Sequence, residues 1–146
     1  MSGILVGVDG SQHSRAALRW AIHEAVQHHA PLTVMIACQE PPRPATGIYW
    51  GIHNYADDSF DPETTRKAVW HFVDEAVNEA GETPPEIHVS VARGDPAAEL
   101  VEASRDADTL VVGSRGSGRF ARLLMGSVSS KVTHHAECPV VVVHRT

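Results

Sequence analysis

Cysteine is scarce in this chain of 146 residues, which has only Cys38 and Cys138. The two lie far apart and form no Cys-x-x-Cys pair, so the sequence excludes a disulfide framework and favours buried thiols in a reducing compartment. No apolar run approaches the roughly 20 residues that a membrane-spanning helix needs. The N-terminus also lacks the basic start and long apolar stretch of a signal peptide. We therefore expect a cytoplasmic protein that does not enter the membrane.

Basic residues are also few: 12 Lys and Arg stand against 18 Asp and Glu, giving a formal net charge of -6. A nucleic-acid surface normally needs a basic face, so we expect no nucleic-acid partner. The ten histidines include the adjacent pairs His28-His29 and His134-His135. Neighbouring residues of a helix point about 100° apart, so neither pair can converge on one ion. We expect no metal site.

Apolar segments alternate with helical segments along the whole chain. Strands are predicted at residues 4–8, 32–38, 87–91, 109–112 and 139–143, and helices after Ser11, Asp61 and Asp95 and over residues 128–136. Each of the two aspartates is followed by proline, which is a typical helix start. This alternation predicts an α/β fold: a doubly wound, Rossmann-like, five-stranded parallel sheet in the order 3-2-1-4-5 with helices on both faces. The length fits a single domain, residues 1–146.

Residues 39 to about 60 have a different character, because prolines, glycines and the aromatic residues Tyr49, Trp50 and Tyr55 gather there. A loop of this length in a compact domain is usually a lid, an interaction surface or a mobile segment. The sequence leaves these three alternatives open.

The segment after the fourth predicted strand is typical of a phosphate site. Gly113 and Gly116 follow the buried strand, and Gly126-Ser127 opens the last helix. Glycines allow backbone N–H groups to approach an anion, and a helix start adds the positive end of its dipole. No Asp or Glu occurs between Thr109 and Ala136, whereas four cations do: Arg115, Arg119, Arg122 and Lys131. A glycine-rich surface loop is the alternative interpretation.

Familiar nucleotide motifs are absent. A Walker A loop needs Gly-Lys, which does not occur, and after Gly116-Ser-Gly118 the third position of G-x-G-x-x-G falls on Ala121. Asp9 follows the first strand, which should adjoin the fourth, so its carboxylate would lie across the crevice from the glycines. A turn with a helix cap is the alternative for Asp9, and we interpret Ser11 only as the cap.

With these elements placed, the whole chain resembles the universal stress protein family. The resemblance rests on Val6-Gly-Val-Asp-Gly-Ser11, Val111-Val-Gly-Ser-Arg-Gly116, Leu123-Leu-Met-Gly-Ser-Val-Ser129 and Cys138-Pro-Val-Val-Val-Val143. The signature of the ATP-binding branch, G-x2-G-x9-G-[ST], is complete in this sequence.

The resemblance implies ATP as ligand, with or without Mg²⁺, held through its phosphates by Gly113, Gly116, Gly126 and Ser127. Asp9 would meet the ribose or adenine, Gly7 would line the crevice, and the backbone of Ala37 would contact adenine. The remaining candidates from the same stretch are Arg115, Ser117, Gly118, Arg119, Arg122, Val128 and Ser129.

The resemblance also implies a stress-response regulator that acts as a nucleotide-dependent sensor or switch. Three alternatives stay open: a slow ATPase, an AMP- or cyclic-AMP-binding protein, and a nucleotide-free interaction protein. Related α-hydrolase-like enzymes carry an S-G-G-x-D-S loop or a paired-histidine motif. Residues 7–11 contain neither, so we expect no catalytic residue.

The last predicted strand, residues 139–143, is short, apolar and at the edge of the sheet, where unpaired backbone groups attract another chain. Two copies could pair antiparallel across a two-fold axis. The resemblance implies the same, because many members carry two such domains and this sequence has one. We therefore expect a homodimer; an edge shielded by a helix is the alternative.

Overall fold

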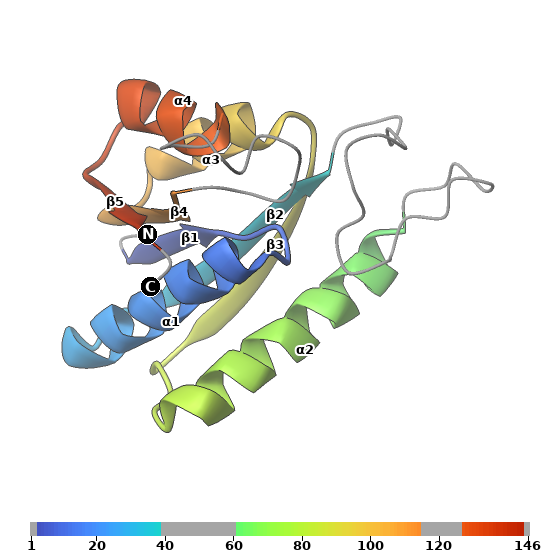
Figure 1. Ribbon diagram of the computed structural model, residues 1–146, viewed down its shortest axis with the longest axis vertical. Coiled ribbons are helices and arrows are strands. Elements are labelled where there is room, and N and C mark those ends of the chain that lie inside the picture. The colour runs from blue at the N-terminus through green and yellow to red at the C-terminus, as the bar shows by residue number, and fades with distance from the viewer. Residues whose placement is uncertain (1–2, 39–60, 115–126, 145–146) are drawn as a thin grey trace.

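The computed structural model describes residues 3–38, 61–114 and 127–144 (Figure 1). Strands and helices alternate along these residues, as the sequence predicted. The elements are β1 (Ile4–Gly7), α1 (Gln12–Gln27), β2 (Leu32–Cys38), α2 (Pro62–Ala80), β3 (Ile87–Arg93), α3 (Pro96–Ser104), β4 (Thr109–Gly113), α4 (Ser127–His135) and β5 (Val140–Val143).

All five strands are parallel, and their order is β3-β2-β1-β4-β5. The predicted fold class and strand order are confirmed. Figure 1 shows α1 and α2 on one face of the sheet and α3 and α4 on the other. Chain order reverses at β1, which pairs with both β2 and β4, so the switch point lies between β1 and β4.

Local chemistry at the helix ends explains where the helices begin and stop. Asp61 and Asp95 cap the two helices that start with proline, each accepting a hydrogen bond from a backbone N–H in the first turn. Ser11 caps α1 in the same way. Gly81 ends α2 in the left-handed conformation, with φ 70°, which glycine adopts without steric cost. These four boundaries match the sequence prediction.

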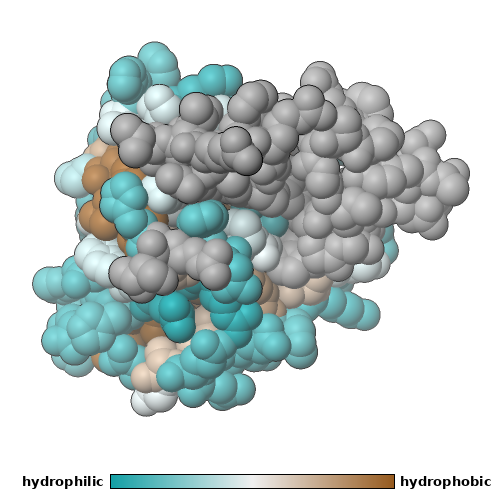
Figure 2. Space-filling model, viewed as in Figure 1, coloured by the Kyte–Doolittle hydropathy of each residue, from teal (hydrophilic) through white to brown (hydrophobic). Residues whose placement is uncertain are grey.

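The sheet separates two apolar cores. On the side of α1 and α2, the inner helix face is built from small and branched residues, including Ala17, Leu18 and Ile22, which are fully buried against β1 and β2. On the side of α3 and α4, Leu100 and Val132 pack with Leu110 of β4. Figure 2 shows a hydrophobic area at the side of the molecule where β5 runs, and each of the four valines of β5 is partly exposed.

Candidate functional site

The register of the sheet brings two predicted site residues to neighbouring strand ends. Ile4 of β1 lies opposite Thr109 of β4, and Val6 lies opposite Val111. Continuing this register by two to three residues brings the chain at Asp9 opposite Ser114, next to Gly113. Both strands run in the same direction, so Asp9 and Gly113 lie at neighbouring carboxyl ends of the sheet, at the switch point where such folds bind ligands.

Asp9 lies in a tight turn that links β1 to α1. Val8 still donates a backbone hydrogen bond to the Met35 oxygen of β2 over 3.0 Å, after which Gly10 adopts a positive φ of 86°. Asp9 Oδ1 accepts from the Ser11 N–H at 2.9 Å. Ser11 Oγ in turn accepts from the Ser14 N–H at 3.2 Å, so its predicted role as a cap is confirmed. Asp9 therefore forms a turn, as its alternative interpretation expected, and the residue is partly exposed at the end of β1.

The start of α4 is fixed to the end of β4. Ser114 donates its backbone N–H to the Val143 oxygen of β5 at 2.9 Å, and its own carbonyl accepts from Ser129 Oγ at 3.2 Å. Ser114 and Ser129 are only 3% and 2% exposed. The first turn of α4 therefore lies against the carboxyl end of β4, with Ser127 exposed and Val128 half-buried. In this arrangement Ser129 positions the helix start, a tertiary role that its sequence motif did not reveal.

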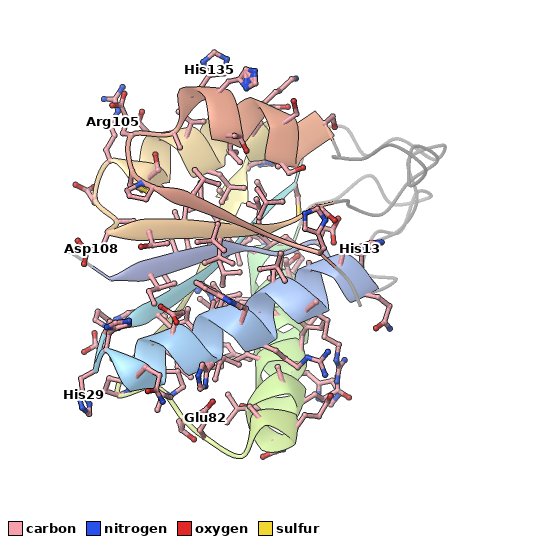
Figure 3. All side chains as sticks on the ribbon, turned by 60° about the vertical axis from the view of Figure 1, so that its left-hand side comes forward. His13, His29, Glu82, Arg105, Asp108 and His135 are labelled. Atoms are coloured by element: carbon pink, nitrogen blue, oxygen red, sulfur yellow. The ribbon has the colours of Figure 1, made fainter. Side chains whose placement is uncertain are left out.

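Two predicted site glycines have packing reasons of their own. A Cβ on Gly113 would lie 2.7 Å from the backbone oxygen of His13 in α1. Figure 3 shows His13 at the start of α1, beside the carboxyl end of β5. A Cβ on Gly7 would lie 2.8 Å from Leu100 Cδ1 of α3. The backbone of α1 thus lies close against the end of β4, and the Leu100 side chain of α3 fills the space beside the end of β1.

Ala37 belongs to the part of β2 that extends beyond β1. The β1–β2 ladder ends with the bond from Val8 to Met35, and backbone groups two residues apart on a strand point the same way. The N–H and C=O of Ala37 therefore point to the side where β1 has ended. This direction suits contact with a flat ring lying over the end of β1.

Seven predicted site residues lie outside the described residues, and nothing in the structure tests them. They are Arg115, Gly116, Ser117, Gly118, Arg119, Arg122 and Gly126. The same holds for the predicted loop at residues 39–60.

Metal and thiol chemistry have little support in the described part of the chain. Within residues 3–38, 61–114 and 127–144, no three His, Cys, Asp or Glu side chains gather as a metal site would require. Cys38 is buried at the end of β2, as predicted, whereas Cys138 is partly exposed. Partial burial raises the pKa of the Cys138 thiol, which disfavours a reactive thiolate there. Among the described helices, none is long and apolar enough to cross a membrane.

Comparison with known proteins identifies the family. The model of the universal stress protein family matches residues 1–144. A universal stress protein of Mycolicibacterium smegmatis is 37% identical over 145 residues, which cover 97% of this chain and 48% of that protein. The chain therefore belongs to the universal stress protein family, and the resemblance inferred from its motifs is confirmed. It spans about half the length of the curated relatives it matches.

Solved structures agree with this assignment. The universal stress protein UspA from Lactobacillus plantarum has a TM-score of 0.71 and 26% identity, and the match covers 97% of both chains. A universal stress protein solved in complex with cAMP has a TM-score of 0.68 and 26% identity, covering 100% of this chain and 98% of that one.

Proposed function

We propose that this chain binds an adenine nucleotide, with ATP as the preferred ligand, and acts as a nucleotide-dependent sensor or switch in a stress response. The observation that carries the proposal is the position of the two ends of the G-x2-G-x9-G-[ST] pattern. Its first glycine, Gly113, ends β4, and its last residue, Ser127, begins α4, which is held against that strand end by Ser129. The related protein solved with cAMP supports adenine nucleotides as the ligand class.

The described residues fit the two ends of such a ligand. The first turn of α4 has no acidic residue, so the positive end of its dipole suits phosphate. Asp9, at the end of the neighbouring strand, offers carboxylate oxygens for ribose hydroxyls, and the Ala37 backbone offers a donor and an acceptor for the base. Bound ATP would supply the negative charge that the helix start attracts, and Mg²⁺ would neutralise part of that charge.

The same geometry provides a route from ligand to assembly. Ser114, next to Gly113 of the predicted phosphate site, donates its N–H to the oxygen of Val143, the last residue of the edge strand β5. A nucleotide that orders this strand end would also order the proposed dimer edge. Linkage is reciprocal, so ATP should tighten dimerisation by the same factor by which dimerisation tightens ATP binding. A nucleotide with equal affinity for monomer and dimer would change neither.

The ligand can be identified directly. Mass spectrometry of small molecules released from the purified protein, followed by calorimetric titration with ATP, AMP and cAMP, tests the proposal and ranks the three ligands. Binding of ATP at one per chain, tighter than AMP and cAMP, is the expected result. Tighter binding of AMP or cAMP would show that ATP is not the preferred ligand. No binding of any adenine nucleotide would refute the proposal.

Replacing Asp9 with alanine should weaken ATP binding by about 1.5–3 kcal/mol, because a hydrogen bond to a charged acceptor is lost. Asp9→Asn is the matched control: it keeps the oxygen that accepts from the Ser11 N–H, and so preserves the turn. We expect 2′,3′-dideoxy-ATP to lose less affinity than ATP in both variants, as measured by calorimetry. Equal losses for both ligands would move Asp9 from the ribose to the base or to a structural role.

We also propose that two copies pair through β5. Among the described residues, β5 pairs only with β4, and its valines are partly exposed. Val141→Lys should shift the protein from dimer to monomer in light scattering at micromolar concentration, because a desolvated cation opposes strand pairing. A wild-type monomer at that concentration, or a Val141→Lys protein of unchanged mass and stability, would contradict the β5 dimer.

A further inference from the structure

The sheet has a second edge, β3, and a side chain of α2 forms a hydrogen bond with the backbone of this edge strand. The described sheet pairs β3 only with β2. Along β3, the backbone of Glu86 and of Gly94 bonds to β2, through Leu32 and Cys38. Backbone groups alternate between the two sides of a strand, so residues at even positions face β2 and those at odd positions face outward. The carbonyl of Val89 therefore points to the open edge.

Arg66 of α2 forms a hydrogen bond with this carbonyl. Its Nη1 donates a hydrogen bond to the Val89 oxygen at 2.5 Å, across 23 positions of sequence. Val89 is the third residue of the seven-residue strand, and Arg66 is partly buried where it makes this contact. A further strand adding to β3 needs that oxygen for its own ladder, so it would have to displace the guanidinium.

We propose that Arg66 guards the β3 edge and thereby confines strand addition by a second copy of this chain to β5. Two mechanisms act together. The guanidinium binds one of the outward backbone acceptors of the edge, and a two-fold pairing of β3 with β3 would bring two Arg66 cations toward each other. Like charges at a strand edge are a recurrent means of preventing edge-to-edge association.

The consequence concerns the size of the assembly. A chain that could pair antiparallel through both edges would join β5 to β5 and β3 to β3 in alternation, and such a series has no natural end. With β3 blocked, pairing through β5 closes as a dimer. The inference depends on the proposed β5 dimer only for this final size; the guarding of β3 can be tested without it.

Sedimentation velocity over a range of concentrations, applied to the full chain, provides the test. Arg66→Met removes the donors and the charge but keeps a long apolar stem. Lys67→Met, one residue further along α2, removes the same charge from an exposed side chain and serves as the matched control. We expect Arg66→Met to reach about twice the wild-type mass or more at high concentration, while Lys67→Met stays at the wild-type mass.

A second background isolates the β3 edge. In Val141→Lys, where β5 pairing is disfavoured, adding Arg66→Met should restore self-association, and adding Lys67→Met should not. Arg66→Gln, a shorter neutral residue with good helix propensity, should give the same result and replaces Arg66→Met if that variant fails to fold. Calorimetry with ATP is run on every variant, so a failure of nucleotide binding is recorded separately from a failure of the guard.

The inference is overturned if folded Arg66→Met or Arg66→Gln has the same mass distribution as Lys67→Met in both backgrounds. It is also overturned if the association of the Arg66 variants leaves the outward amides of Val89 and Val91 exchanging with solvent as fast as in wild type. Slowed exchange at those two amides, with β5 unchanged in the Val141→Lys background, supports pairing through β3.

Discussion

Gly126→Asp is expected to abolish tight ATP binding while leaving the chain folded. Gly126 immediately precedes Ser127, the first residue of α4, and the glycine pattern predicts that its backbone meets the phosphates. An aspartate adds a like charge against the phosphates, which costs on the order of several kcal/mol and corresponds to a loss of affinity of about a thousandfold. Its carboxylate would also accept hydrogen bonds from the first N–H groups of α4 and compete with the ligand for them.

The same substitution separates binding from folding. Aspartate is among the favoured residues before a helix and interacts well with the helix dipole, so the free energy of unfolding should not fall. Gly126→Asn is the matched control, because it has nearly the same shape and capping ability without the charge. In calorimetry we expect Gly126→Asn to weaken ATP binding much less than Gly126→Asp does. Wild-type affinity for ATP in folded Gly126→Asp would refute the proposed phosphate site.

Most of the fold follows from local chemistry that the sequence displays. Asp61-Pro62 and Asp95-Pro96 mark helix starts without tertiary contacts. The aspartate accepts a hydrogen bond from an N–H of the first turn, and the proline has no N–H that would need a partner. Gly81 marks a helix end for an equally local reason. The strand order was predicted from the doubly wound pattern, in which chain order reverses beside the first strand.

The candidate site was predicted less completely, because its supporting contacts join residues from separate elements. Asp9 and Gly113 could be expected together, since each follows a strand at the switch point. The bond from Ser129 to Ser114 could not, because it depends on how α4 docks on β4. The same applies to Arg66, whose acceptor on β3 is a backbone oxygen without any sequence signature. The roles of the glycines and arginines in residues 115–126 remain predictions.

Substitution of Gly113 should lower both the free energy of unfolding and the affinity for ATP. A Cβ there would meet two backbone atoms of α1, the His13 oxygen at 2.7 Å and the His13 carbonyl carbon at 2.9 Å. Neither atom can rotate away as a side chain could, so α1 or β4 must shift. Overpacking of this kind typically costs 1–3 kcal/mol, and we expect Gly113→Ala to lower the free energy of unfolding by about 3 kcal/mol.

The displacement of α1 in Gly113→Ala should also weaken ATP binding. His13 lies two residues after Ser11, whose N–H is bonded to the carboxylate of Asp9, so a displaced α1 start moves the Asp9 turn. Gly81→Ala is the control: its Cβ would meet nothing within 4 Å, but φ is +70°, so only backbone strain of about 1–2 kcal/mol is added.

Urea unfolding and calorimetry with ATP measure the two effects in the same proteins. We expect Gly113→Ala to lose more stability than Gly81→Ala and to bind ATP more weakly, whereas Gly81→Ala keeps wild-type affinity because it lies at the far end of α2. The slope of the unfolding free energy with urea should stay the same, since the native fold is kept. A Gly113→Ala protein as stable as wild type would show that α1 yields freely at its start, and the Asp9 turn would then not be held in place by packing against β4.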